Sequence, residues 1–507
     1  MQQQLSPAED VAGPTSSPPR LPELARGPVF SAMATVAVVL TAFSGGYGYH
    51  RDELYFLMLP PRWGYVDQPP LTPLLAGWSA DAFGDRLWAL RLPATVAVVL
   101  SVLVLALVTR ELGGGRGAQT LCAWGYAFAS MTLVFGHVLL TSSVDLPVWP
   151  AVLLFAVRAV LRDRPQWWLL AGVVVGVSMY NKLLVALLVV ALAAGVALVG
   201  PRRLLWSRWA VGAVGLGLVI GAPNLVYQAT NGWPQLAMGG ALADNNADET
   251  RILMWPMLLV MLGPPLVPVW VAGLVGLLRR HEWRPVRFVA VAFPVLLVLV
   301  FVMGTQFYYP FGVLAVLYAV GCVPVAAWVG RSRPRRRVVA SAVALNAAVS
   351  TVLALPVVPL PSLGDTPVAD INQVPRDSVG WPTYVRQVAH VYRSLDAEDR
   401  SSAVVVASNY GEAGAVERYG AGLRLPRVYS GQNQLYYERR PPDTATVVVF
   451  VGGQLVVAQP LFRSCDVRGR LDNHLDVDNE EQGQPIAVCR GPVGGWDTVW
   501  PRLRHLD

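Results

Sequence analysis

Two carboxylates and an arginine stand side by side directly after the first long apolar run: Arg51, Asp52 and Glu53. A carboxylate at the edge of a bilayer loses hydration, which raises its pKa and makes it a better proton acceptor. The neighbouring arginine can hold a phosphate through paired N–H donors. The trio therefore suits a general base beside a phosphate site. A solvated loop whose charges only mark the membrane interface explains the same spacing equally well.

Two further carboxylates are candidates for the same site. Asp67 follows in the same loop, within the run Gly-Tyr-Val-Asp-Gln-Pro-Pro-Leu at residues 64–71. Asp145 stands between two strongly apolar runs, where an ionisable side chain is costly and usually functional. Asp145 also suits a helix N-cap ahead of Pro147. The two roles are compatible, and the setting favours the functional one.

One cation and two tyrosines complete the set of candidates. Lys182 is the only lysine of the chain and lies in an apolar setting, where it suits a lipid phosphate. The alternative is a side chain that extends to the membrane interface from a helix end. Tyr308 and Tyr309 form another short turn. They can donate hydrogen bonds to a phosphate, but taken alone they favour the aromatic belt of a membrane protein.

The elements that must position these residues are membrane helices. The 507 residues are 54% hydrophobic and 14% charged, whereas a soluble protein is typically about 25% charged. The net charge of +7 does not indicate a nucleic-acid partner, because the arginines form short clusters between apolar runs. Residues 1–27 are rich in Pro, Ser and Gln and are predicted to be a disordered cytoplasmic leader, not a cleavable signal peptide.

Eleven apolar runs are long enough, or nearly so, to cross a bilayer as helices. They are residues 28–46, 92–109, 119–139, 145–160, 167–180, 183–200, 210–227, 252–278, 288–303, 310–330 and 338–356. Five of the connecting loops carry arginine clusters, around residues 110–116, 158–164, 202–208, 279–287 and 331–337. With the N-terminus inside, all five are cytoplasmic, as the positive-inside rule requires.

The same topology places the candidate residues on the outer side. The outer segments include the loop at residues 47–91 and everything after about residue 357. Because nucleotide sugars and ATP are absent there, an activated group must arrive on a lipid. The residues from 357 to 507 alternate β-rich and helix-like runs and predict a small α/β domain. A disulfide between Cys465 and Cys489 and two free thiols are equally compatible with the sequence.

At this point the chain resembles a known family. The runs at residues 49–55 and 64–71 are similar to the first outer loop of the family-39 glycosyltransferases, which include polyprenyl-phosphate-mannose mannosyltransferases and aminoarabinose transferases of lipid A. The segments at 143–147, 181–182 and 308–310 follow in the expected order, and those at 407–414 and 430–433 are similar to tails of bacterial members. The resemblance implies the C-type membrane glycosyltransferase fold, with about eleven transmembrane helices in residues 28–356.

The resemblance also implies an activity and a role for each candidate. A sugar, most commonly mannose in this family, would move with inversion from a polyprenyl-phosphate donor to an acceptor outside the cytoplasm of a bacterial cell. Asp52 would be the general base, with Glu53 and Asp145 shaping the site. The remaining candidates would hold the donor: Arg51, Lys182 and Tyr308 or Tyr309 at the phosphate, and Asp67 and Gln68 at the sugar or a divalent metal ion such as Mg²⁺, Mn²⁺ or Zn²⁺.

One departure from the family and three rival functions bear on the partners. Gln68 stands where the aminoarabinose transferases have a lysine, which disfavours lipid A as acceptor; a protein, a glycolipid, a glycan or an exported natural product all remain. A secondary transporter would show related halves and helices broken at mid-membrane, but the sequence has no internal repeat and its candidate carboxylates lie at one face. A flippase or ligase of envelope precursors would share the cations but would not need the Asp52–Glu53 pair, and a membrane scaffold would need neither.

Overall fold

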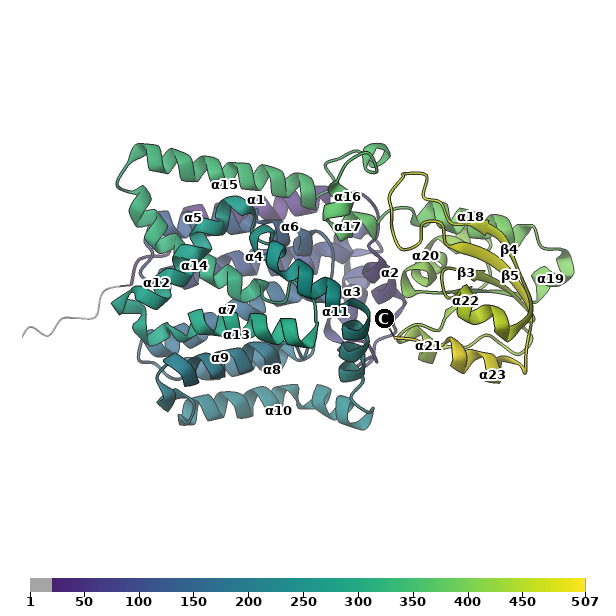
Figure 1. The fold of residues 1–507 in the computed structure, drawn as a ribbon, viewed down its shortest axis with the longest axis horizontal. Helices are drawn as coiled ribbons and strands as arrows, with labels where there is room; N and C mark the ends of the chain where they lie inside the picture. Colours follow the sequence, from purple (N-terminus) through teal and green to yellow (C-terminus); the bar gives the residue numbers. More distant parts are fainter. Residues whose placement is uncertain (1–20, 507) are drawn as a thin grey trace, which may run out of the picture.

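The computed structural model describes residues 21–506. They form a long helical bundle with an α/β unit packed on one end (Figure 1). Most of the predicted leader, residues 1–20, lies outside the described part of the chain. Residues 21–25 have no regular structure, and the first helix, α1, begins at Arg26 and ends at Phe43.

Every predicted span contains a helix or a pair of helices. The unbroken spans are α1, α4 (Leu87–Glu111), α7 (Thr141–Leu161), α8 (Trp167–Ser178), α9 (Val185–Val199), α10 (Arg208–Thr230), α13 (Phe288–Met303), α14 (Phe311–Val329) and α15 (Arg333–Ala354). The paired ones are α5 (Arg116–Ala127) with α6 (Ser130–His137), and α11 (Pro234–Val260) with α12 (Val267–Arg279). Among the described residues, six helices are long and apolar enough to cross a membrane alone, and the bent α11–α12 pair is a seventh.

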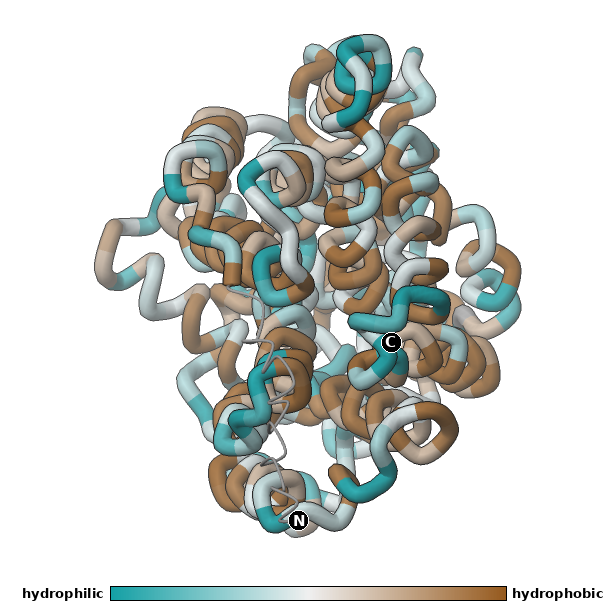
Figure 2. Tube along the Cα trace, turned by 90° about the vertical axis from the view of Figure 1, so that its left-hand side faces the viewer, coloured by the Kyte–Doolittle hydropathy of each residue, from teal (hydrophilic) through white to brown (hydrophobic). Residues whose placement is uncertain are grey.

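The remaining apolar helices are short or broken for local reasons. Helices α8, α9 and α13 are apolar but have fewer than 18 residues. The α11–α12 pair is bent by 70° at the sequence Gly263-Pro264-Pro265, where two successive residues lack the N–H that a continuous helix needs. Figure 2 views the bundle from the end opposite the sheet, and hydrophobic residues run along most of its helices.

Two short helices form the end of the bundle that faces the sheet. They are α2 (Arg51–Met58) and α3 (Leu71–Phe83), and both belong to the loop predicted at residues 47–91. The loops with arginine clusters lie at the other end of the bundle, beyond α12 and α14 in Figure 1. The arginine-rich loops that predict the topology therefore lie together at one end of the bundle, and the C-terminal unit lies at the other end.

The C-terminal unit is a five-stranded mixed sheet with helices. Its strands are β1 (Ala403–Ala407), β2 (Val428–Ser430), β3 (Val447–Val451), β4 (Phe462–Arg470) and β5 (Pro485–Pro492), in the order β2-β1-β3-β5-β4. Strand β1 pairs in parallel with β2 and β3, and β5 is antiparallel to β3 and β4. Helices α18 (Trp381–Arg393) and α20 (Tyr410–Gly420) pack on the face of the sheet nearer the bundle (Figure 1). The predicted fold class is confirmed; the domain boundaries at residues 27 and 356 stay predictions.

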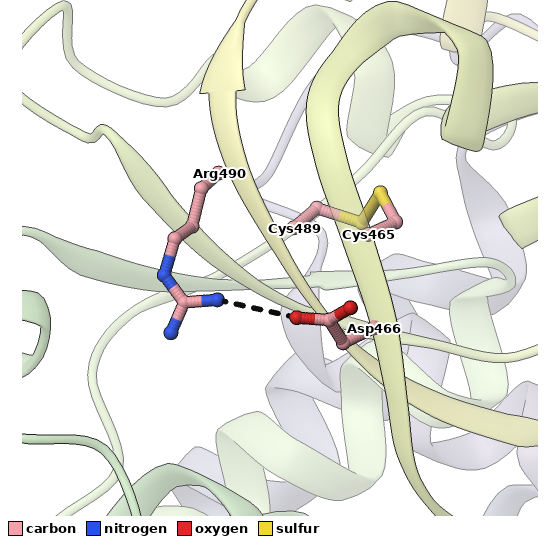
Figure 3. Close-up of a disulfide and its surroundings, with 4 residues drawn as sticks. All are labelled: Cys465, Asp466, Cys489 and Arg490. Atoms are coloured by element: carbon pink, nitrogen blue, oxygen red, sulfur yellow. Dashed lines mark ion pairs between the residues drawn. A yellow bond between two sulfur atoms is a disulfide. The ribbon is translucent and has the colours of Figure 1, made fainter.

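A disulfide joins the two strands at one edge of this sheet. Cys465 of β4 lies opposite Cys489 of β5 in the antiparallel register, and the two are bonded (Figure 3). Arg490 and Asp466, the neighbours of these cysteines, form an ion pair of 3.7 Å across the same two strands. Of the two alternatives that the sequence left open for these cysteines, the structure has the disulfide. Cys122 and Cys322 are buried free thiols.

Candidate active site

One large cavity of about 2010 Å³ runs from the sheet end of the bundle into its interior. Its polar end is lined by Asp52, Asp67 and Lys182 from the bundle and by Tyr410 and Glu480 from the C-terminal unit. Its remaining wall is mostly apolar and comes from α8, α9, α10 and α11. Seven of the nine sequence-predicted site residues line it, namely Arg51, Asp52, Asp67, Gln68, Lys182, Tyr308 and Tyr309.

Helix α2 presents Asp52 to this cavity because its N-terminus is fixed by a capping box. The His50 side chain accepts a hydrogen bond from the Asp52 N–H (3.2 Å), and the Glu53 carboxylate accepts one from the His50 N–H (2.9 Å). Two free N–H groups at the start of the helix are thereby satisfied. Asp52 is in the first turn of the helix, where its charge interacts favourably with the helix dipole.

Glu53 is completely buried and bound on all sides by protein donors. Its carboxylate accepts hydrogen bonds from Arg91 Nε (2.8 Å) and Nη2 (2.9 Å) and from the Leu139 N–H (3.0 Å). Arg91 also donates to the carbonyls of Ser44 and Gly48. Glu53 is absent from the residues that line the cavity. The geometry therefore ties α2 to α4 and to the segment after α6 through Glu53, and the predicted role of Glu53 in shaping the site stays a prediction.

Two tyrosines connect the carboxylates of the cavity. Tyr410 Oη donates to Asp52 Oδ1 and Tyr55 Oη donates to Asp67 Oδ1, each over 2.9 Å. The rings of the two tyrosines are 4.8 Å apart. Burial raises the pKa of Asp67 to about 7; the hydrogen bond from Tyr55 opposes this rise, and the nearby Asp52 charge adds to it. The cavity thus holds two carboxylates in different environments.

The raised pKa of Asp67 predicts a pH dependence of stability. Because the folded-state pKa exceeds the value of about 3.9 in an unfolded chain, the stabilisation is complete below pH 4 and is lost as the pH rises through about 7. We expect the melting temperature of the wild type to fall over this window, and that of Asp67→Asn to fall less. Thermal unfolding in nanodiscs between pH 5 and pH 8.5 measures this. An identical slope for both proteins would contradict the prediction.

Lys182 and Asp145 are positioned through one asparagine and one serine. Lys182 Nζ donates to Ser142 Oγ (3.0 Å) and lies 5.4 Å from the Tyr309 ring centre and 5.9 Å from that of Tyr308. Asn181 Nδ2 donates to Asp145 Oδ1 (3.0 Å). The structure therefore brings the lysine and both tyrosines together, with Asp145 in a small adjoining hollow of about 30 Å³.

The alternative role of Asp145 as a helix cap is wrong. Helix α7 begins at Thr141 and its N-cap is Leu140, so Asp145 lies inside the helix and not at its end. The tyrosine turn likewise differs from a membrane-facing aromatic belt, because both rings line the cavity and contact the lysine.

Arg51 and Gln68 lie at the border between the bundle and the C-terminal unit. The Arg51 guanidinium forms an ion pair with Glu480 and lies over the Tyr410 ring, 4.9 Å from its centre. The Arg51 N–H donates to the Asp377 carbonyl (3.0 Å). Gln68 is buried against the cavity. That Arg51 binds a phosphate stays a prediction. The Arg51 guanidinium would then have to contact both the phosphate and Glu480.

A metal site at Asp67 is not supported by its surroundings. Within residues 21–506, no three His, Cys, Asp or Glu side chains gather in a way that could hold a metal ion. Asp67 Oδ1 accepts a hydrogen bond from the Tyr55 hydroxyl instead. We therefore derive no chemical step through a metal, and the metal requirement stays an open prediction.

Sequence reasoning missed the contribution of the C-terminal unit to this cavity. Besides Tyr410 and Glu480, the lining includes Arg376, Asp377 and Gln432. Tyr410 lies in the run Ala-Ser-Asn-Tyr-Gly-Glu-Ala-Gly at residues 407–414, whose similarity to bacterial family members predicts no role for the tyrosine. The capping residue, the aromatic residue and the two glycines of this run were the sequence features that could have indicated a role for Tyr410 in the site.

Comparison with known proteins agrees with this geometry. A family model described as dolichyl-phosphate-mannose-protein mannosyltransferase matches residues 67–227. The crystal structure of ArnT from Cupriavidus metallidurans bound to undecaprenyl phosphate is 16% identical, with a TM-score of 0.58, and covers 92% of this chain and 98% of its own. The chain has the fold of the C-type membrane glycosyltransferases. The predicted resemblance to this group is confirmed.

The C-type glycosyltransferase fold extends over almost the whole chain. The apo form of the same ArnT covers the same shares of both chains, with 15% identity and a TM-score of 0.55. No match was found among curated proteins. The region matched by the family model contains four of the predicted site residues, namely Asp67, Gln68, Asp145 and Lys182, and ends on α10 at Tyr227.

Proposed function

We propose that the chain is a membrane glycosyltransferase that moves a sugar from a polyprenyl-phosphate donor to an acceptor hydroxyl, with Asp52 as general base. The observation that carries this proposal is the cavity itself, because one space combines a polar end with a long apolar wall from α9, α10 and α11. A phosphate with a polyprenyl chain requires both surfaces. The family match and the C-type fold support the same reaction class.

The arrangement suits a single displacement. The acceptor hydroxyl transfers its proton to the Asp52 carboxylate while its oxygen bonds to the anomeric carbon. The bond from that carbon to the phosphate oxygen breaks on the opposite side, and the electron pair stays on the phosphate. A lipid phosphate needs no proton to leave, since Lys182 and the tyrosines beside it stabilise its charge. One displacement inverts the configuration at the anomeric carbon.

The charge distribution supports an orientation for this reaction. The arginine-rich loops lie at the end of the bundle away from the polar end of the cavity, and from the positive-inside rule we infer that this polar end and the C-terminal unit lie outside the cytoplasm (Figure 1). In a bacterial plasma membrane this side meets proteins, glycolipids, cell-wall glycans and exported products, and each can supply the acceptor hydroxyl. Mannose, the commonest sugar of the family, is the first sugar to test.

The experiment that tests the proposal follows a labelled sugar. The purified protein in lipid nanodiscs is given a radiolabelled polyprenyl-phosphate mannose together with an extract of the bacterial envelope. We expect the label to leave the lipid and appear on a component of the extract. A water-soluble mannose phosphate without the polyprenyl chain is the matched control and should react far more slowly. Absence of turnover with several lipid-phosphate sugars would refute the proposal, and movement of the intact lipid across the bilayer would favour a flippase.

Lys182 gives a prediction for donor binding. Lys182→Met removes the cation beside Tyr308 and Tyr309, and we expect the affinity for polyprenyl phosphate to fall about 10- to 100-fold, the usual effect of losing a charged hydrogen bond. Native mass spectrometry with added undecaprenyl phosphate measures it. Arg116→Met, which removes an exposed cation at the opposite end of the bundle, is the control. Equal affinities for both variants would show that Lys182 does not contact the phosphate.

A further inference from the structure

Helix α20 of the C-terminal unit docks directly on α2, the helix that carries Asp52. The contact is close because α20 has glycines at the two positions that face α2. A Cβ at Gly411 would lie 3.0 Å from the Arg51 Cβ, and one at Gly414 would lie 2.7 Å from the Leu54 Cβ. Any larger residue would separate the two helices. The backbone of α20 is therefore held at a fixed distance from the first turn of α2.

The start of α20 is fixed as firmly as the start of α2. Asn409 caps the helix by accepting a hydrogen bond from the Glu412 N–H (2.8 Å), and the Glu412 carboxylate accepts from the N–H groups of Ser408 (2.8 Å) and Asn409 (3.2 Å). The Tyr410 N–H donates to Gln432 Oε1 (2.6 Å). The hydrogen bonds of Ser408, Asn409 and Glu412 thus fix the first turn of α20, from which the Tyr410 side chain extends.

The ring of Tyr410 also contacts two side chains of α2. The Arg51 guanidinium lies 4.9 Å from the ring centre, and the Tyr55 ring centre is 4.8 Å away. Its hydroxyl donates to Asp52 Oδ1 over 2.9 Å. Burial, followed by the charge of Asp52, raises the pKa of Tyr410 well above its usual value, so the hydroxyl keeps its proton and remains a donor.

We infer that Tyr410 is the positioning residue of the base: it orients the Asp52 carboxylate and keeps it ionised for the reaction proposed above, so the C-terminal unit is a working part of the active site. This inference rests on the proposed function. A hydrogen bond donated to a carboxylate favours its charged form and lowers its pKa. It also restricts rotation about the side chain, which keeps the accepting oxygen in one place.

Several other ionisable groups share the cavity with Asp52 and must be considered in any pH profile. Asp67, Asp377 and Tyr410 interact electrostatically with Asp52. The lining of the same cavity also includes His50, Arg51, Tyr55 and Glu480. Of these groups within residues 21–506, Tyr410 is the one that hydrogen-bonds the Asp52 carboxylate. Removal of the Tyr410 hydroxyl alone therefore tests one contact while the other charges stay in place.

The test is Tyr410→Phe, which keeps the ring beside Arg51 and Tyr55 and removes only the donor. We expect the acidic limb of the pH profile of kcat/KM to move up by about one pH unit, and the pH-independent rate to fall about tenfold or more through loss of orientation. Tyr419→Phe, a tyrosine on the same helix that does not line the cavity, is the matched control and should leave both unchanged. An unshifted profile with a rate within twofold of the wild type would overturn the inference.

Two additional measurements separate this role from a general loss of structure. If Tyr410 acts through Asp52, adding Tyr410→Phe to Asp52→Asn should not lower the residual rate further, whereas independent roles would multiply. If Tyr410→Phe unfolds, 3-fluorotyrosine at position 410 keeps the contact and makes the phenol a stronger donor, so the limb should move down. No movement, or movement upward, would overturn the inference in that case.

A readout without activity distinguishes failure of this inference from failure of the proposed function. Infrared titration of the protein in nanodiscs follows the protonated-carboxyl band, and the part of it that disappears in Asp52→Asn belongs to Asp52. We expect that part to titrate at higher pH in Tyr410→Phe than in the wild type. This result with no sugar transfer would refute the proposed function alone. Coincident titrations with normal transfer would refute the role of Tyr410 alone.

Discussion

Asp52→Asn is expected to lower kcat/KM for sugar transfer by about 10³-fold, within the range that a general base usually contributes. The amide has nearly the same shape as the carboxylate, and its oxygen can still accept the hydrogen bond from Tyr410. What it lacks is the ability to take the proton of the acceptor hydroxyl. Donor binding should change little, because the phosphate contacts that we propose are at Lys182 and the tyrosines beside it.

The measurement is initial-rate transfer from the labelled lipid donor, together with donor affinity for both proteins. Asp85→Asn is the matched control, because Asp85 is an exposed carboxylate paired with Arg418 at the same end of the molecule and does not line the cavity. It should retain full activity. Turnover of Asp52→Asn equal to that of the wild type would show that Asp52 is not the general base. It would favour a transporter or a scaffold function instead.

Arg91→Met is expected to have the largest effect on stability. It leaves the Glu53 carboxylate buried without its cation, and breaking a buried pair in this way costs about 3–5 kcal/mol of unfolding free energy. Arg91 also ties the carbonyls of Ser44 and Gly48 to α4, so the start of α2 should loosen. Activity is expected to fall with it, because α2 carries Asp52.

Thermal unfolding in nanodiscs, compared at one pH, measures this loss. The matched control is Arg418→Met, which breaks the exposed pair with Asp85 and should cost less than about 1 kcal/mol. The double variant Arg91→Met with Glu53→Leu removes both buried charges and should regain part of the stability. Equal melting temperatures for Arg91→Met and Arg418→Met would show that the buried pair does not stabilise α2.

The helical framework could be predicted because its signals are local. Apolar runs and arginine clusters lie within single segments, so each predicted span contains helix, and the loops with arginine clusters lie at one end. The same holds for strands β1 and β3, whereas the Cys465–Cys489 disulfide was one of two alternatives that the sequence left open. The breaks at 128–129 and 261–266 were not predicted, since a hydropathy window averages across them.

The division of roles between neighbouring residues could not be predicted in the same way. Asp52 and Glu53 are adjacent, and on a helix their side chains point about 100° apart. One of them faces the cavity and the other faces Arg91, 38 residues further along the chain. Tyr410 was more distant still, since its contact with Asp52 spans 358 residues. Spacing within a motif carries no information about either partner.

The same long-range contact determines when during biosynthesis the active site can exist. Helix α20 is anchored by strands β1, β3 and β5, and β5 ends only at Pro492. A nascent chain with all its apolar spans in the membrane would therefore still lack the partner of Asp52. Because contacts of such sequence separation form late, the unfinished protein is expected to stay inert toward its lipid substrate until the last strand has been added to the sheet.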